Sequence, residues 1–198
     1  MISGPAGAAG WLSEARHIES PNVDARPPGV VVDLLVIHHI SLPPGWFTGP
    51  AIQQLFCNQL DCDSHPAYED LRDLRVSAHF LIRRHGGLIQ FADIHARAWH
   101  AGVSAFRGRD RCNDFSVGVE LEGDGERAFT ESQYRRLERL LVTLLDHLPI
   151  RFLAGHSDIA PDRKTDPGPC FDWSRLHKVS ARYGLQGPWL LDRSPKDG

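Results

Sequence analysis

The stretch VVVDLLVIHHI, residues 30–40, is almost wholly apolar and rich in β-branched side chains until it reaches two histidines. A short apolar run of this kind is typical of a strand that is buried in a sheet. The SLPPG that follows ends the strand just beyond the histidines. Because side chains alternate between the two faces of a strand, His38 and His39 point to opposite faces, and only one of them can readily join a site on a given face.

Helices and further strands are predicted downstream of this strand. Residues 50–58 predict a short helix, and residues 62–75 predict a loop with a turn or two of helix. Residues 78–93 hold two apolar runs around the HGG at positions 85–87, which predicts a β-hairpin. Residues 97–114 show no sustained period and predict a long loop, of a length that is often functional.

FSVGVELEG, residues 115–123, alternates cleanly and predicts a second strand. Its apolar side chains share one face. Glu120 and Glu122 share the other face with Ser116 and Gly118. This strand therefore carries two carboxylates on one face.

The longest predicted helix covers residues 129–149, where Thr130 and Gln133 form a capping box and leucines recur on one stripe. A short strand at residues 150–155 and a last helix at residues 172–183 follow. The chain of 198 residues fits one domain with a sheet and several helices around one core.

The predicted domain has a flanking segment at each end. Residues 1–29, rich in Gly, Pro and Ala, predict an extended lead-in without regular elements. The domain itself is expected at residues 30–184. Residues 185–198 are expected to form a loosely attached extension.

Charge and composition exclude several classes of partner. The formal net charge of -3 gives no electrostatic reason to expect nucleic acid. No apolar run approaches the roughly 18–20 residues that span a membrane, and the N-terminus does not resemble a secretory signal. The four cysteines form no CxxC pair and are expected to be free thiols. We therefore expect a cytoplasmic monomer with neither nucleic acid nor a membrane as partner.

GHSDIAPDRKTDPGP, residues 155–169, gathers charge on a segment that its prolines keep from forming one helix. Such a segment can fold back and bring His156 close to Asp166. Lys164 would then lie beside the same point, where a cation can stabilise negative charge that develops during a reaction. A solvated loop with charges paired at the surface explains the spacing equally well.

The position of His38 favours a site over a solvated loop, because strand ends are where sheet proteins commonly hold reactive groups. Two histidines, one carboxylate and an open fourth position are the ligand set of a catalytic zinc ion. A nearby carboxylate could accept a proton from the zinc-activated water. Glu120 and Glu122 both qualify, and alternation cannot choose between them.

Several long motifs resemble the AmpD family of zinc-dependent N-acetylmuramoyl-L-alanine amidases. They are LLVIHHISLPPG, LRVSAHFLIRR, RAWHAGVS, GRDRCNDFSVGVELEG and GHSDIAPDRKTDPGPCFDW, in this order and spacing. Shared features run from about residue 10 to residue 183, nearly the whole chain. The fold implied is α/β (α+β), a single domain with a mixed central sheet packed by helices, as in peptidoglycan recognition proteins and related amidases.

The resemblance implies a role for each matched position. The zinc ligands implied are His38, His156 and Asp166. The implied catalytic carboxylate is Glu120, and the implied oxyanion-stabilising lysine is Lys164. The arginines implied to hold the carboxylates of the peptide stem are Arg75 and Arg111. Guanidinium groups suit that last task because they bind carboxylates in a fork. His39 stands where the family usually has a substrate-binding asparagine.

The activity implied is zinc-dependent hydrolysis of the amide between (1,6-anhydro)-N-acetylmuramic acid and L-alanine in the recycling of peptidoglycan, with a small muropeptide as substrate. Two alternatives stay open: a peptidoglycan-binding module without activity, and an amidase of intact wall peptidoglycan. Among the other histidines, His79 is expected to support the sheet, with a contact to a metal ligand left open. His100 could line the substrate cleft.

Overall fold

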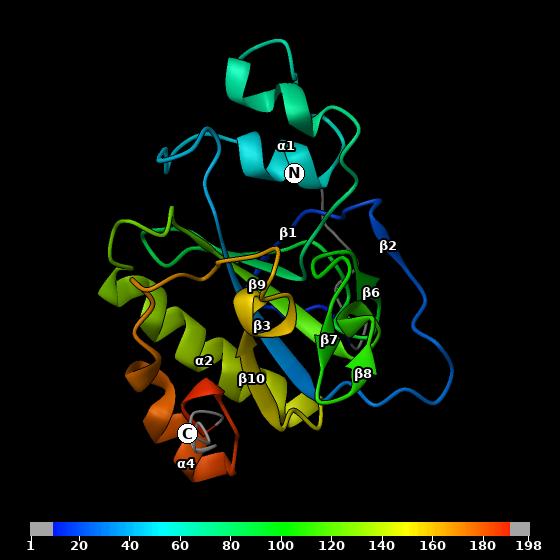
Figure 1. Ribbon diagram of the computed structural model, residues 1–198, viewed down its shortest axis with the longest axis vertical. Helices are drawn as coiled ribbons and strands as arrows, with labels where there is room; N and C mark the ends of the chain where they lie inside the picture. Colours follow the sequence, from blue (N-terminus) through cyan, green and yellow to red (C-terminus); the bar gives the residue numbers. More distant parts are fainter. Residues whose placement is uncertain (1–9, 191–198) are drawn as a thin grey trace, which may run out of the picture.

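A mixed six-stranded sheet forms the centre of the fold in the computed structural model, which describes residues 10–190 (Figure 1). Its order is β1 (Arg16–His17), β5 (Leu88–Gln90), β4 (Phe80–Ile82), β9 (Ser116–Glu122), β3 (Leu34–Ile40) and β10 (Phe152–Gly155). Only the β4–β5 hairpin is antiparallel, and the other neighbours run parallel. The predicted fold class, the two long strands and the hairpin are confirmed.

β3 and β9 are the interior strands that fix the geometry of the sheet. Leu34, Leu35, Val36 and Ile37 of β3 are completely buried, because apolar groups cover both faces. Along the parallel pair, Leu34 lies opposite Ser116 and His38 lies opposite Glu120. This register brings a histidine and a carboxylate side by side at the end of the two strands.

The longest helix, α2 (Glu131–His147), covers one face of the sheet (Figure 1). Its leucine stripe packs in one cluster with Leu35 and Ile37 of β3 and with Val117 and Val119 of β9. Burying one such leucine side chain contributes roughly 1.5–3 kcal/mol before the cost of ordering the chain. This helix therefore fixes which side chains of the sheet point away from it.

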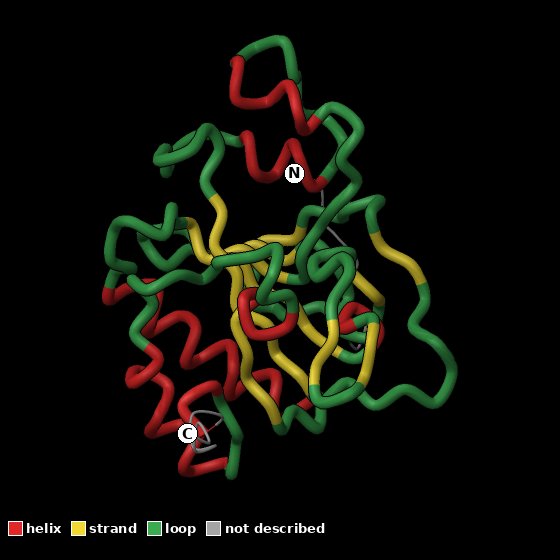
Figure 2. The backbone as a smooth tube through the Cα atoms, viewed as in Figure 1, coloured by secondary structure: helices red, strands yellow, loops and turns green. Residues whose placement is uncertain are grey.

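Shorter elements lie around the sheet, and η3, α4 and η4 pack on the same side as α2 (Figure 2). The helical ones are α1 (Ala51–Phe56), η1 (Pro66–Leu71), η2 (Cys112–Asp114), α3 (His156–Ile159), η3 (Trp173–Leu176), α4 (His177–Tyr183) and η4 (Pro188–Leu190). Two small antiparallel pairs join β2 (Val23–Asp24) to β6 (Arg97–Ala98) and β7 (Ala105–Phe106) to β8 (Arg109–Asp110). No helix within residues 10–190 combines the length and apolar character needed to cross a bilayer.

The lead-in was wrongly predicted to lack regular elements. β1 extends the central sheet beside β5, and Ile18 and Ser20 continue this pairing through backbone bonds to Gln90 and Phe91. Pairs of two residues leave no alternation to detect in the sequence, which explains why β1 and β2 were missed. The same reason applies to β6, β7 and β8 inside the predicted long loop.

The start of the C-terminal extension is also more firmly attached than predicted. Leu185 is buried in the main core, Gln186 forms a parallel bridge with Phe152, and the ring of Trp189 packs against Trp173. The chain therefore stays on the domain as far as residue 190. The rest of the predicted extension, residues 191–198, lies outside the described residues.

The predicted capping box at the start of α2 is confirmed. The Gln133 backbone N–H donates to Thr130 Oγ1 at 3.2 Å, and the Thr130 backbone N–H donates to Gln133 Oε1 at 3.0 Å. The Thr130 hydroxyl also donates to the Arg84 carbonyl at 2.6 Å, which joins the helix to the hairpin. This cap therefore stabilises both the helix and its attachment to the sheet.

We expect Thr130→Ala to lower the free energy of unfolding by about 1 kcal/mol, because the Gln133 backbone N–H loses its acceptor and the Arg84 carbonyl loses a donor. Denaturant unfolding followed by circular dichroism measures this change. Thr130→Ser is the matched control, since it keeps the hydroxyl and should stay close to the parent. Equal losses in both variants would show that the methyl group, not the cap, stabilises this end.

Candidate metal centre

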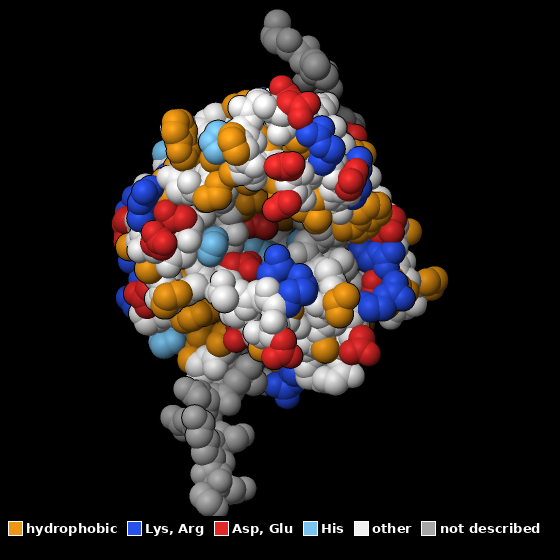
Figure 3. Space-filling view, turned by 45° about the horizontal axis from the view of Figure 1, so that its top comes forward, with side chains coloured by type: hydrophobic (Ala, Val, Ile, Leu, Met, Phe, Trp, Pro, Cys, Tyr) orange, Lys and Arg blue, Asp and Glu red, His pale blue; other side chains and the backbone are white. Residues whose placement is uncertain are grey.

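Three potential metal ligands converge at the edge where β3 and β10 end. His38 Nδ1 lies 2.9 Å from His156 Nδ1 and 3.1 Å from Asp166 Oδ2. His156 Nδ1 lies 3.2 Å from the same carboxylate oxygen. The three residues form the metal-ligating cluster found among the described residues, and all are buried or nearly so. Figure 3 shows histidine and acidic side chains gathered with Lys or Arg around a hollow near the middle of the face drawn.

Parallel strand pairing explains why the two histidines meet. Gly155 of β10 lies opposite Ile37 of β3, so the next residue on each strand is a histidine. His156 is also the first residue of α3, which turns the chain away from the sheet. Because parallel neighbours end at the same edge, the register alone brings His38 and His156 together.

Asp166 reaches the histidines because the segment after α3 folds back. The Ser157 backbone N–H donates to the Asp166 carbonyl at 2.8 Å, and the backbone N–H groups of Arg163 and Lys164 donate to the Ala160 carbonyl. Gly155 permits this approach, because a Cβ there would lie 2.7 Å from the Pro167 ring. The predicted return of this segment onto His156 is therefore present in the structure.

The donor atoms fit a cation better than they fit one another. Burial lowers the pKa of His38 to about 4, against the opposing effect of Asp166, so its ring is neutral near pH 7. His156 Nε2 lies 3.1 Å from the Ala101 carbonyl, which can only accept, so Nε2–H donates there and Nδ1 faces His38 and Asp166. Three potential ligand atoms thus face one another at hydrogen-bond distance. Two imidazole nitrogens and a carboxylate oxygen with an open fourth position suit zinc.

Glu120 faces this cluster from the neighbouring strand. Its Oε2 is buried and has no hydrogen-bond partner among the described residues. Burial, and then the charge of Asp166, raise the pKa of Glu120 well above its usual value, while Lys164 lowers it. A buried carboxyl group with a raised pKa is suited to accept and return a proton.

Glu122 occupies a different environment although it shares a face with Glu120. One of its oxygens lies 3.2 Å from Arg83 Nε, and the other accepts from the Arg84 backbone N–H at 2.9 Å. These partners tie Glu122 to the hairpin. The structure thus distinguishes two carboxylates that strand alternation left equivalent.

Two further predicted site residues, Lys164 and His39, lie outside the three-ligand cluster. Lys164 is half-buried on the returning segment, and its charge lowers the pKa of both His38 and Glu120. His39 lies on the opposite face of β3 from His38, beside Gly123 and Gly125, and its buried Nδ1 has no partner within the described part of the chain. His38 is therefore the histidine of the pair that belongs to the cluster.

Neither predicted substrate-binding arginine contacts the cluster. Arg75 is exposed and donates to the carbonyls of Arg72 and Leu74. Arg111 has 71% of its side chain exposed and lies 3.4 Å from Asp114. Both guanidinium groups are accessible to a ligand.

His79 and His100 have more specific roles than the sequence indicated. His79 Nδ1 accepts from the Gly118 backbone N–H at 3.0 Å, so it supports the sheet as predicted. The sequence left open that His100 lines the cleft; the structure buries it, with its Nδ1 2.9 Å from Nε2 of His38. Its loop comes from residues that show no period, so no pattern in the sequence indicated this contact.

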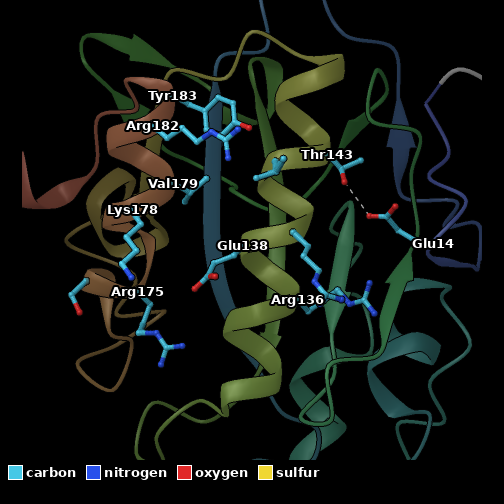
Figure 4. Close-up of a pocket in the computed structure, with 12 residues that line it drawn as sticks. Glu14, Arg136, Glu138, Thr143, Arg175, Lys178, Val179, Arg182 and Tyr183 are labelled. Carbon is cyan, nitrogen blue, oxygen red and sulfur yellow. Dashed lines mark hydrogen bonds between the residues drawn. The ribbon is translucent and has the colours of Figure 1, made fainter.

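A separate groove lies between α2 and α4, with a volume of about 980 Å³ (Figure 4). Its charged lining includes Arg136, Glu138, Arg139, Arg175, Lys178 and Arg182. None of the predicted site residues lines it. The metal cluster, not this groove, is therefore the candidate for chemistry.

A mixed sheet that holds two histidines and a carboxylate beside a buried glutamate defines a metal-dependent hydrolase. The family described as N-acetylmuramoyl-L-alanine amidase matches residues 27–169. AmpD amidases from Escherichia coli and Haemophilus influenzae are 52% and 46% identical, over 87% and 84% of this chain and 96% and 92% of their own. The chain belongs to the AmpD family of N-acetylmuramoyl-L-alanine amidases, as its motifs predicted.

Solved structures agree with this assignment. A selenomethionine AmpD crystal structure is 49% identical, covers 87% of this chain and 97% of its own, and has a TM-score of 0.83. The E. coli amidase AmiD, solved with an anhydro-N-acetylmuramic acid tripeptide, is 27% identical with a TM-score of 0.56, covering 83% of this chain and 66% of its own. A Drosophila peptidoglycan recognition protein, 17% identical over 90% of this chain and 99% of its own with a TM-score of 0.56, shares the fold.

We expect zinc to raise the unfolding temperature of chelator-treated protein, because an ion that binds only the folded state stabilises it. At 100 times the dissociation constant the gain is about 2.7 kcal/mol. Asp166→Asn should lose most of this gain. Asp162→Asn, an exposed neighbour on the same segment, should retain it.

Differential scanning calorimetry with and without added zinc measures both effects. Magnesium serves as a second control, since it prefers an all-oxygen octahedral shell that this cluster lacks. Equal gains with magnesium, or an equal loss in the Asp162 variant, would contradict a specific site at Asp166.

Proposed function

We propose that this amidase uses a zinc ion to hydrolyse the amide between the lactyl group of 1,6-anhydro-N-acetylmuramic acid and L-alanine, in the recycling of peptidoglycan. His38, His156 and Asp166 hold the ion, and Glu120 and Lys164 carry out the chemistry. The enzyme works as a cytoplasmic monomer on small muropeptides. The E. coli and H. influenzae relatives named 1,6-anhydro-N-acetylmuramyl-L-alanine amidase support this substrate.

One observation carries the proposal: a buried, unpartnered carboxylate lies opposite the histidine of a three-ligand cluster. Glu120 pairs with His38 in the β3–β9 register, and its Oε2 finds no partner among the described residues. A buried polar atom without a partner costs free energy and therefore needs an explanation. A water molecule bonded to Glu120 Oε2 would satisfy it and would be the nucleophile.

The reaction divides between the ion and the side chains. When bound, zinc polarises a carbonyl and lowers the pKa of water. Glu120 accepts a proton from the attacking water as the new C–O bond forms. Glu120 then gives this proton to the alanine nitrogen as the C–N bond breaks. The products are the muramic carboxylic acid and the free amine of the peptide.

Lys164 and the two arginines act on opposite ends of the substrate. Lys164 lies on the segment between His156 and Asp166, and its charge influences both His38 and Glu120. A fixed cation there stabilises the oxyanion of the tetrahedral state. Arg75 and Arg111 bind carboxylates of the peptide stem, and His39 offers one hydrogen bond to the substrate.

Glu120→Gln should lower kcat by about 10²–10⁴-fold while zinc stays bound, because the amide cannot accept the proton. Release of free tripeptide from anhydromuramyl tripeptide, followed by mass spectrometry, measures the rate. Metal content by atomic absorption separates catalysis from binding. Glu122→Gln is the matched control on the same strand face and should keep most of the activity.

Full activity in Glu120→Gln would exclude this residue as the proton acceptor. Parent protein that is folded and zinc-loaded, yet releases no tripeptide, would favour the peptidoglycan-binding module. Faster release from intact wall peptidoglycan than from the anhydro substrate would favour the wall amidase. The binding module and the wall amidase are thus distinguished by different measurements.

Lys164→Met should lower kcat by about 10²–10³-fold with little change in KM, because its charge acts on the transition state.

Arg75→Ala and Arg111→Ala should raise KM with little change in kcat, because a stem carboxylate is bound alike in the ground state and in the transition state. Arg72→Ala, an exposed neighbour that pairs with Asp63, is the control. Steady-state kinetics that reverse this division would contradict the assignments.

A further inference from the structure

A chain of buried polar groups runs from His38 away from the metal cluster into the domain. His38 Nε2 lies 2.9 Å from His100 Nδ1, and His100 Nε2 lies 3.1 Å from Ser116 Oγ. Ser116 Oγ in turn lies 2.6 Å from the Cys112 carbonyl oxygen. All three side chains are buried, so no solvent competes for these contacts.

The Cys112 carbonyl ends this series of hydrogen-bonded groups and determines the position of every proton in it. A carbonyl oxygen can only accept, so the single Ser116 hydroxyl proton points to Cys112. Ser116 Oγ must then accept from His100 Nε2–H. An imidazole ring with its one proton on Nε2 carries a lone pair on Nδ1. Its Nδ1 is therefore an acceptor for His38 Nε2–H.

The consequence for His38 is a fixed tautomer. With its one ring proton held on Nε2, Nδ1 carries the lone pair that faces His156 and Asp166. A metal ligand whose other ring nitrogen donates to a fixed acceptor is oriented and made more basic. We propose that His100, fixed by Ser116, is a positioning residue that holds His38 in its metal-binding tautomer. This inference rests on the ligand set of the proposed function.

The same short loop holds the second histidine ligand. The Ala101 carbonyl accepts from His156 Nε2–H at 3.1 Å. The backbone N–H groups of His100 and Ala101 both donate to Asn113 Oδ1, at 3.1 and 2.8 Å. Two consecutive residues, held by one amide side chain, thus orient both imidazole ligands.

Gly118 makes room for this arrangement. A Cβ at position 118 would lie 2.4 Å from His100 Cγ and 2.6 Å from its Nδ1. The imidazole therefore lies directly against the backbone of β9. Gly118 and Ser116, two positions apart on the same face of the strand, are together shaped to the His100 ring.

The test reads the tautomer of His38 without any catalysis. Long-range ¹H–¹⁵N correlation spectra of metal-free, ¹⁵N-labelled full-length protein show which ring nitrogen carries the proton. We expect one His38 species with the proton on Nε2 in the parent protein. In His100→Phe the acceptor is gone, and both tautomers of His38 should appear.

Metal affinity, measured by competition with a chromophoric zinc chelator, supplies the second reading. His100→Phe should weaken zinc binding about 10–100-fold, as for other groups that orient a metal ligand. His100→Asn should regain most of the loss, because its Oδ1 can accept where Nδ1 did. His79→Phe is the control for packing: it removes a buried histidine that bonds to Gly118, Ala96 and Arg26 and packs edge-on against His100, but it leaves the His100 Nδ1 acceptor in place.

Ser116→Ala provides a milder variant should His100→Phe fail to fold. Without the hydroxyl, His100 can place its proton on either nitrogen, so His38 should again show both tautomers. A proton on His38 Nδ1 in the parent protein, unchanged zinc affinity in His100→Phe, or an equal loss in His79→Phe would each overturn the proposal. A single Nε2–H species with tight zinc but no amide hydrolysis would instead refute only the proposed function.

Discussion

The register of three parallel strands, β9, β3 and β10, is the constraint on which the site depends. It places His38 opposite Glu120 and brings His156 one residue beyond the last β10–β3 pair. The register is fixed by burial: Leu35 and Ile37 pack in the cluster beneath α2. A slip of one residue would send those side chains to the other face and carry His38 away from its partners. The apolar core thus sets the geometry of a polar site.

Burial on both faces imposes a second requirement, because polar groups inside the fold must find partners. His79, Glu122 and Ser116 meet this requirement through bonds to the backbone or to Arg83. Glu120 Oε2 does not among the described residues. The unmet group lies close enough to Asp166 and Lys164 for their charges to shift its pKa. This contrast separates Glu120, the proposed reacting carboxylate, from Glu122 more sharply than sequence position does.

Periodicity and turn chemistry predicted the parts of the fold that are local. The strand at residues 34–40 follows from an apolar run, the strand at residues 116–122 from alternation, and the capped helix from the Thr130–Gln133 pair. The prolines after His156 indicated the returning segment. Two-residue strands such as β1 carry no period. The contact of His100 with His38 joins positions that are 62 residues apart through a loop without a pattern. The choice between Glu120 and Glu122 depended on Arg83 and Arg84 of the hairpin, whose pairing no alternation reveals.

The candidate metal ligands differ in how firmly the fold holds their backbone. His38 belongs to a strand that is covered on both faces, so its backbone opens only with the sheet. Asp166 is held by a single backbone bond from Ser157, its side-chain contacts and short turns at Ala160. A bound ion would therefore join a rigid ligand to a more weakly held one, so metal binding is expected to stabilise residues 156–166 more than the sheet.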